Sequence, residues 1–275
     1  MKYIIKDMSL MVKIAFIVFF SIMMMVLLTP LIAPYGETEI VGQAWEPISK
    51  AFILGTDDVG RDMFSRLLYG GRMSIFIAFC ATLLSFCIGI LFGFLVSFYN
   101  GWFDHLISRV VDILISMPAI IITLLVLSLF KSSIFVLIMI SGILDSTRVF
   151  RMSRSLAMDI CKSDYVQSSL LRGESKLWIM RRDILPNCSG VLLVEFCLRF
   201  CFQILFISGF SFLALGIQPP YADWGGIVRD NAAAISFGMI IPLYPALCIG
   251  MVTVCINFIA EWVVNLYNIN IDEGM

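Results

Sequence analysis

The stretch DYVQSSLLRGESKLWIMRRDILPN, Asp164 to Asn187, is a polar and basic segment in an otherwise apolar chain. Apolar runs long enough to cross a bilayer lie on both sides of it. Apolar residues recur at helical spacing before and after Gly173, where glycine permits a sharp turn. A basic loop that only fixes membrane topology and a surface that binds a soluble partner both fit this pattern. Either reading indicates an all-α membrane protein.

The composition of the whole chain excludes a water-soluble globule. Of its 275 residues, 60% are hydrophobic and 14% are charged, whereas soluble domains are about half apolar and a quarter charged. The net charge of −1 gives no signal for nucleic-acid binding. His105 is the single histidine and the eight cysteines form no CxxC pair, so no metal site is expected.

Six apolar runs are candidates for membrane spans, because about 20 helical residues cross the hydrocarbon core. Their limits are approximately 14–33, 73–98, 113–130, 132–144, 191–215 and 237–264. The fourth is long enough only if it extends to Val149 or Phe150. The first is too long for a signal peptide and has no clear cleavage site, so a retained anchor is expected. Each run is expected to be a helix, because irregular backbone cannot face lipid.

Basic residues favour a cytoplasmic position for the central stretch. If the N-terminus is inside, twelve of the 19 Lys and Arg residues fall in inner segments, six in outer segments and Arg199 in a span. Cytoplasmic segments are the richer in Lys and Arg, so both termini are expected in the cytoplasm. The chain then divides into an N-terminal transmembrane helix with an extracytoplasmic loop, residues 1–72, and a five-helix core, residues 73–275, with a cytoplasmic loop at about 159–187.

The first outer loop carries the motif LGTDDVGRD, Leu54 to Asp62. Gly55 and Gly60 permit tight turns. Its charged residues can form a local network of ion pairs and hydrogen bonds; they are Asp57, Asp58, Arg61 and Asp62. The motif favours a structural cap at the membrane surface, and direct contact with another protein is the alternative.

The second outer loop carries QPPYADWG, Gln218 to Gly225. Pro219 and Pro220 stiffen this loop, and Trp224 suits the aromatic belt at the membrane interface. A structural role is again favoured.

Glu195 and Arg199 are charged residues inside the fifth apolar run. Because they are four positions apart, they share one face of a helix and can pair. Charges within a span are candidates for a transport pathway. The alternative is an interfacial pair whose side chains extend to the membrane surface.

The central stretch resembles the cytoplasmic coupling loop, or EAA loop, of bacterial ABC-importer permeases. It is similar to the C-type branch of the dipeptide, oligopeptide and nickel permeases, which reads close to E-Y-V-x-A-A-x-x-x-G, followed by a helix and L-P-N. The matching positions are Asp164, Tyr165, Val166, Gly173, Leu185, Pro186 and Asn187. Ser168 and Ser169 replace the two alanines and stay small, so that the helix can lie close to a partner. Pro186 is expected to end the second helix of the loop.

The outer motifs extend the resemblance over nearly the whole chain from about Leu54 onward. The family motif L-G-T-D-x-x-G-R-D matches at Gly55, Thr56, Asp57, Gly60, Arg61 and Asp62. SFLALG, which begins at Ser211, resembles S-F-L-G-L-G. QPPYADWG, with Pro219, Trp224 and Gly225, resembles Q-P-P-x-x-x-W-G. Four motifs in the right order between the right spans make the resemblance specific.

The resemblance implies the six-helix fold of type I importers and a permease subunit of an ATP-driven importer in the bacterial inner membrane. Besides membrane lipid, it implies a second homologous permease subunit, two cytoplasmic ATPase subunits that dock on the loop 164–187, and an extracytoplasmic solute-binding protein. No G-x-x-x-x-G-K-[ST] motif occurs, so the chain has no phosphate cradle and is not expected to be an enzyme. ATP and Mg are expected on the partner subunits, and no cofactor is expected on this chain.

The cargo that the resemblance implies is a nickel or other metal chelate (a metallophore) or a short peptide. Many peptide-transporting members carry an acidic residue at the position of Ile207, so the sequence leans toward metal chelates. An ion-coupled secondary transporter that works without ATPase subunits is the alternative function. It needs ionisable relays or interrupted helices in the membrane, and few candidates other than Glu195 and Arg199 are present.

Overall fold

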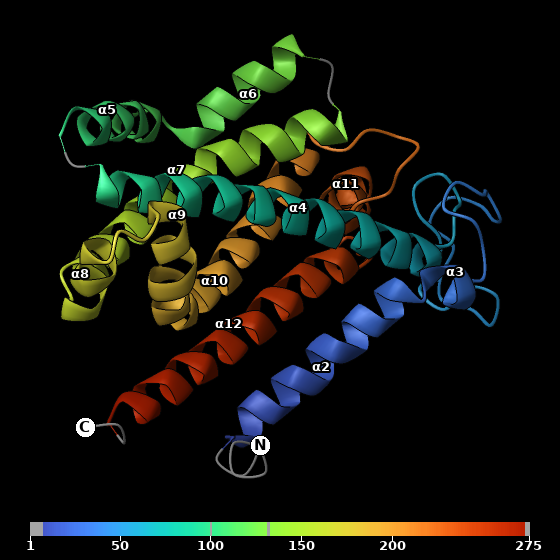
Figure 1. Ribbon diagram of the computed structural model, residues 1–275. Coiled ribbons are helices and arrows are strands. Elements are labelled where there is room, and N and C mark those ends of the chain that lie inside the picture. Colours follow the sequence, from blue (N-terminus) through green and yellow to red (C-terminus); the bar gives the residue numbers. More distant parts are fainter. Residues whose placement is uncertain (1–7, 100, 131–132, 273–275) are drawn as a thin grey trace.

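The described part of the chain is a bundle of helices joined by loops (Figure 1). The structure is a computed structural model that describes residues 8–99, 101–130 and 133–272. The five longest helices are α2 (Leu10–Leu27), α4 (Met63–Phe98), α7 (Ile134–Cys161), α10 (Leu185–Phe212) and α12 (Leu243–Asp272). The shorter ones are α3 (Thr29–Ile32), α5 (Trp102–Ser116), α6 (Ala119–Leu129), α8 (Asp164–Leu171), α9 (Lys176–Ile179), η1 (Met180–Ile184), α11 (Trp224–Asp230) and η2 (Ala232–Phe237). Lys2, Lys6 and Lys131, which entered the count of basic residues, lie outside the described residues.

The membrane fold is confirmed, whereas the count of six spans is not. Within the described ranges, four helical segments are long and apolar enough to cross a membrane: Leu10–Leu27, Met63–Phe98, Lys176–Phe212 and Leu243–Leu266. The bent pair of α5 and α6 gives a fifth if it forms one span. The remaining long helix, α7, carries Asp145, Arg148 and Arg151, so its composition alone does not identify it as a span.

The third apolar run predicts one continuous helix over 113–130, and this prediction is wrong. The chain breaks between α5 and α6, and the two helices are bent by 86°. Met117 is extended, with φ −95° and ψ 138°, because the residue before a proline avoids the helical region. Pro118 also lacks the N–H that a continuing helix needs. Hydrophobicity continues across the break, so the apolar pattern does not reveal it.

The second apolar run, 73–98, predicts a helix that begins later than α4 does. Asp62 caps this helix, because its Oδ2 accepts from the Ser65 N–H at 2.8 Å. α4 therefore begins at Met63, and the predicted boundary between residues 72 and 73 falls inside it.

Pro186 does not end a helix, contrary to the prediction from its ring geometry. The helix runs from Lys176 to Phe212 without a break. The segment η1 is a π-helical turn, in which the Leu185 N–H donates to the Met180 carbonyl five residues before it. Pro186 follows this turn as the second residue of α10, so the helix continues past the residue that lacks an N–H.

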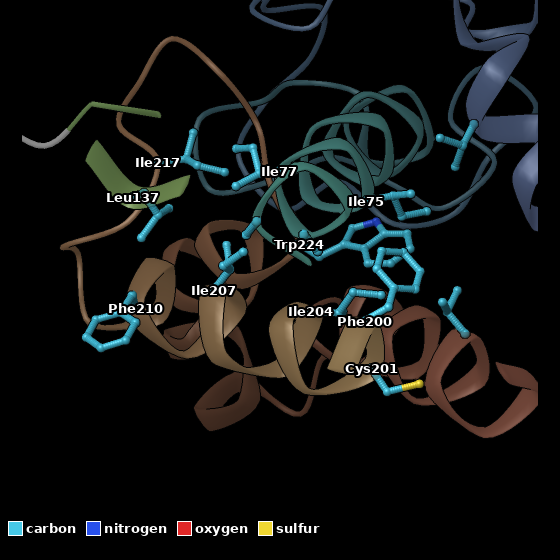
Figure 2. Close-up of a cluster of buried hydrophobic side chains, with 14 of the residues drawn as sticks. Ile75, Ile77, Leu137, Phe200, Cys201, Ile204, Ile207, Phe210, Ile217 and Trp224 are labelled. Atoms are coloured by element: carbon cyan, nitrogen blue, oxygen red, sulfur yellow. The ribbon is translucent and has the colours of Figure 1, made fainter. Parts of the chain in front are cut away.

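Side chains from α4, α7, α10 and α11 meet in one apolar cluster (Figure 2), to which α2 and α12 also contribute. Ile77 and Ile204 are fully buried there, and Ile207 is 1% exposed. Lipid tails are as apolar as these side chains, so van der Waals packing holds the helices together. Ile207, the position that bears on the cargo, therefore belongs to the packed interior.

The two ends of the bundle differ in character (Figure 1). The helices α8 and α9 lie at the same end as the start of α2 and the end of α12, while α3 lies at the opposite end. The loop that leads from α3 to α4 carries the LGTDDVGRD motif, so the two groups of motifs are separated by the length of the long helices.

Candidate functional site

The central stretch forms two short helices, α8 and α9, joined by a turn at Gly173. Asp164 lies in the first turn of α8, where a negative charge interacts favourably with the helix dipole. Gly173 ends this helix with φ 79°, and its N–H donates to the Leu170 carbonyl at 3.0 Å. Ser175 Oγ then caps α9 by accepting from the Trp178 N–H at 3.3 Å. The expected helix–glycine–helix arrangement is therefore present.

One face of this loop is buried against the ends of α4, α7 and α10. Val166 of α8, Ile179 of α9 and Ile184 of η1 are fully buried. Their cluster includes side chains from the three long helices, namely Phe86, Phe94, Val149, Ala157, Cys188 and Leu192. Close-packed side chains have low compressibility, so a movement of the loop reaches all three long helices directly.

The opposite face of the loop is exposed and carries most of the predicted coupling residues. The exposed ones are Asp164, Tyr165, Ser168, Gly173, Leu185, Pro186 and Asn187. Two large apolar side chains also face outward, Leu171 at 88% and Leu177 at 65% exposure, and Arg181 and Arg182 are exposed near them in the chain. Exposed apolar side chains beside charged ones are typical of protein contact sites.

Ser169 does not take the place expected for the second small residue. It is 3% exposed. Its Oγ donates to the Tyr165 carbonyl at 3.1 Å and accepts from Arg172 Nη2 at 2.8 Å. Ser168, by contrast, is exposed. Only Ser168 can lie against a partner. Ser169 and Val166 are buried within this chain and keep α8 packed on the rest of the bundle.

At the other end of the bundle, Asp57 organises the LGTDDVGRD motif. Its side chain is fully buried. Oδ1 accepts from the N–H groups of Val59 at 2.9 Å and Arg61 at 2.8 Å. Oδ2 accepts from Arg61 Nε at 2.7 Å and from Arg66 Nη1. Burial raises the pKa of Asp57, but the Arg61 N–H and the Arg66 charge outweigh it and hold the pKa below its ordinary value.

The other members of this motif fix the loop to the start of α4. Gly55 and Gly60 have φ of 78° and 90°, and a Cβ at Gly60 would clash with a neighbouring backbone oxygen. Thr56 Oγ1 donates to the Gln43 carbonyl at 2.6 Å, and Asp62 is the cap of α4. The geometry is that of a rigid cap on the end of a long helix.

We expect Asp57→Asn to lower the free energy of unfolding by about 3 kcal/mol, because the buried Arg66 guanidinium loses its closest carboxylate and keeps only Asp230, 3.8 Å away. The matched control is Asp58→Asn. The pKa of Asp58 is raised by burial and by the charges of Asp57 and Asp230, so loss of its charge is expected to be neutral or slightly stabilising. Thermal unfolding in detergent at pH 7 measures both variants. Equal effects of the two substitutions would contradict the central role of Asp57.

The pH dependence of the wild-type cap follows from the same shift. The folded pKa of Asp57 is lowered, so its contribution is present at neutral pH and is lost as the pH falls through the folded value.

In the second outer motif, Trp224 is buried inside the protein, so its side chain does not face the membrane as the aromatic-belt prediction requires. It is 1% exposed, and its Nε1 donates to the Leu67 carbonyl at 3.0 Å. A Cβ at Gly225 would clash with the Ser208 carbonyl, so glycine is needed for the close contact of α11 with α10. Pro219 is exposed in the loop before α11.

Within the bundle, Glu195 and Arg199 pair at 2.6 Å, from Oε1 to Nε. The pair continues to α7, because Arg199 Nη1 lies 3.5 Å from Asp145 Oδ1 and Arg148 Nη1 lies 3.9 Å from the same oxygen. Sequence reasoning missed Asp145 in this role. The available signal was an acidic and a basic residue three positions apart, in the extension of the fourth apolar run to Val149 or Phe150.

A bundle of membrane helices with a polar helix–turn–helix at one end fits the permease fold that the sequence motifs resemble. The chain belongs to the family of binding-protein-dependent transport system inner membrane components, whose sequence model matches residues 85–271. It is therefore a multi-pass inner-membrane protein and part of an ABC importer complex that also contains an ATPase and a binding protein.

Two relatives make the resemblance more specific. The chain is 31% identical over 242 residues to the dipeptide transport system permease protein DppC of Haemophilus influenzae, covering 86% of this chain and 82% of that protein. It is 30% identical over 242 residues to the di/tripeptide transport system permease protein DppC of Pseudomonas aeruginosa, covering 86% and 80%. The resemblance to ABC-importer permeases of the peptide class is confirmed. The lean toward metal chelates finds no support in these relatives, and an ion-coupled secondary transporter is not favoured.

Proposed function

We propose that this chain is one of two permease subunits in an ATP-driven importer of short peptides. The second permease subunit is a homologue of this chain. Two cytoplasmic ATPases dock on the loop 164–187, and an extracytoplasmic binding protein delivers the peptide at the opposite end of the bundle. ATP and Mg bind on the ATPases, while this chain binds no cofactor and catalyses no reaction. Both termini lie in the cytoplasm, on the same side of the membrane as the loop.

Peptide is the proposed cargo because both relatives are named for dipeptide or di/tripeptide transport. Peptide replaces the metal chelate that the apolar residue at position 207 favoured in the sequence. An apolar residue at that position has a structural reason, since Ile207 is packed in the interior cluster. A charged side chain there would be buried without water, which is unfavourable unless it is paired.

The two-faced loop is the observation that carries the proposal. Its outer face exposes Leu171 and Leu177 for a partner, and its inner face packs on α4, α7 and α10. Closure of the ATPase pair on ATP shifts α8 and α9, and the packed cluster passes this shift to the long helices. The transport pathway then opens to one side of the membrane or the other, as a two-state element biased by nucleotide.

Reconstitution of the whole complex in liposomes tests the proposal. With ATP enclosed and the binding protein outside, we expect a labelled dipeptide to accumulate, and a labelled nickel chelate to stay at background. Each arm is repeated with a non-hydrolysable ATP analogue, which should abolish uptake. Uptake driven by a proton or sodium gradient without ATP would contradict the proposal, and so would accumulation of the nickel chelate alone.

A further inference from the structure

A cluster of four charged side chains lies between α7 and α10, near the middle of α7. Its members are Asp145, Arg148, Glu195 and Arg199. Asp145 lies eleven residues into α7, which is about 16 Å at 1.5 Å per residue; in the six-span topology that the family resemblance implies, this is about half of a 30 Å hydrocarbon core. Charges at this depth are expensive and mark pathways for polar solutes. The cluster is therefore a candidate for direct contact with the transported molecule.

The four charges differ in exposure and in their distance from an opposite charge. Glu195 and Arg199 form a close pair at 2.6 Å, with side chains 17% and 22% exposed. Asp145 is 1% exposed and lies 3.5 Å from Arg199. Arg148 is 48% exposed, and its nearest carboxylate oxygen, on Asp145, is 3.9 Å away. Arg148 is thus the most exposed charge of the cluster and the one farthest from an opposite charge.

The surroundings of Arg148 position it without fixing it. Its guanidinium lies 4.8 Å from the centroid of the Phe202 ring, a cation–π contact that orients the group. Asp145 Oδ1 is buried and accepts no hydrogen bond within the described residues. Charge attraction to Asp145 therefore holds Arg148 near the cluster, and no hydrogen bond has to break when Arg148 turns to a ligand.

A cavity of about 180 Å³ adjoins this arginine. Asp145, Arg148 and Phe202 line one part of it, and Met117, Pro118 and Ala119 line the part where α5 and α6 separate. The N-terminus of α6 therefore opens on the cavity, and a helix N-terminus favours negative charge. Interrupted membrane helices use such ends to bind the carboxylates of their substrates. The volume is below the roughly 300–1,000 Å³ of ordinary ligand pockets, so the cavity admits one end of a peptide.

We propose that Arg148 and the N-terminus of α6 form a subsite for the C-terminal carboxylate of the peptide during its passage. The inference rests on the proposed function as a peptide importer. A guanidinium can donate two parallel hydrogen bonds to a carboxylate. Asp145 and Phe202 position Arg148, and Arg199 stays 3.5 Å from Asp145 Oδ1 when Arg148 turns to the ligand. The subsite lowers the cost of bringing the carboxylate into a medium without bulk water.

Arg148→Gln in the full reconstituted complex tests the subsite. We expect the maximal rate of uptake of a dipeptide with a free carboxylate to fall about tenfold, while uptake of the C-terminally amidated dipeptide changes less than twofold. Both rates are divided by the amount of peptide bound to the binding protein, measured separately, so that selection outside the membrane does not enter. Arg148→Lys keeps the charge but loses the planar fork, and a loss of about threefold for the free carboxylate is expected.

The matched control is Arg151→Gln, on the next turn of α7. Arg151 pairs with Asp112 at 2.7 Å, and both side chains are more than half exposed, so uptake of both peptides is expected to stay at the wild-type rate. If the Arg148→Gln complex does not assemble, Phe202→Leu replaces it, with an expected threefold loss confined to the free carboxylate.

Three outcomes would overturn the subsite. Wild-type rates in an assembled Arg148→Gln complex exclude a contact with the carboxylate. Equal loss of both peptides shows a structural effect that does not depend on the carboxylate. A wild-type complex that imports neither peptide overturns the proposed function itself, and the subsite with it.

Discussion

Gly173→Trp is expected to reduce ATP-dependent peptide uptake at least about a hundredfold while the chain still folds and enters the membrane. Gly173 lies at the exposed turn between α8 and α9, and a Cβ added there would meet no atom of this chain within 4 Å. The chain itself would bear only the strain of a left-handed residue, about 1–2 kcal/mol. A larger loss must therefore arise where the turn meets a partner, which the proposed function identifies as an ATPase.

Two controls separate contact from backbone strain. Gly101 also has positive φ, 103°, and open space around it, so Gly101→Trp is at least as strained and is expected to keep most of the uptake. Asn tolerates the left-handed region, so Gly173→Asn tests a modest side chain with little strain and is expected to be intermediate. Uptake, ATPase activity and the yield of ATPase that copurifies with the permease are measured together. Full uptake by an assembled Gly173→Trp complex would end the assignment of this turn as a coupling contact.

The long helices could be predicted from the sequence because about 20 apolar residues in a row have few alternatives in a membrane. The ends of the helices could not be predicted in this way, because they depend on single residues that do not change the apolar pattern. Asp62 extends α4 by capping it, and Pro118 breaks the third run although the residues on both sides are apolar. Both effects are local chemistry, and the rules for caps and for residues before proline could have found them.

The candidate sites were predictable as motifs but not as surfaces. The order of residues around Gly173 indicates two helices and a turn, yet only packing decides that Ser169 faces inward and Ser168 outward. Trp224 likewise has the composition of an interface residue, but α11 folds back on α4 and α10 and buries it. Asp145 was missed because its partner Arg199 is distant in sequence and near only in the fold.

The second large effect of a substitution, a loss of folded protein, is expected where α4 and α7 lie in direct contact. Small residues recur at every fourth position of α4, and they are Ser85, Gly89, Gly93 and Ser97. Such a stripe lets the backbones of two membrane helices approach closely. Ser153 of α7 makes a hydrogen bond across this close contact, since its Oγ donates to the Gly89 carbonyl at 2.9 Å. A Cβ at Gly89 would lie only 2.6 Å from Val149 Cβ, so the contact tolerates no larger residue.

Gly93→Leu is accordingly expected to lower the yield of folded, monodisperse protein about tenfold or more. A Cβ at this position would clash with Ser153 Oγ and lie 2.9 Å from the Arg154 backbone nitrogen. The backbone cannot move away as a flexible side chain can, so the helices must separate and lose their van der Waals packing. Size-exclusion chromatography and thermal unfolding in detergent measure the result. Gly250→Leu on α12 is the matched control, because a Cβ there meets nothing within 4 Å.

A pair of milder variants distinguishes a local clash from a general intolerance of the helix to substitution. Gly93→Ala is expected to destabilise the protein by about 1–3 kcal/mol through overpacking. Addition of Ser153→Gly removes the hydroxyl that the new methyl group meets, so the double variant should regain part of this loss despite the lower helix propensity of glycine. Such non-additivity is expected only for residues in contact. Purely additive effects would show that the stability of the α4–α7 pair does not depend on close contact at Gly93.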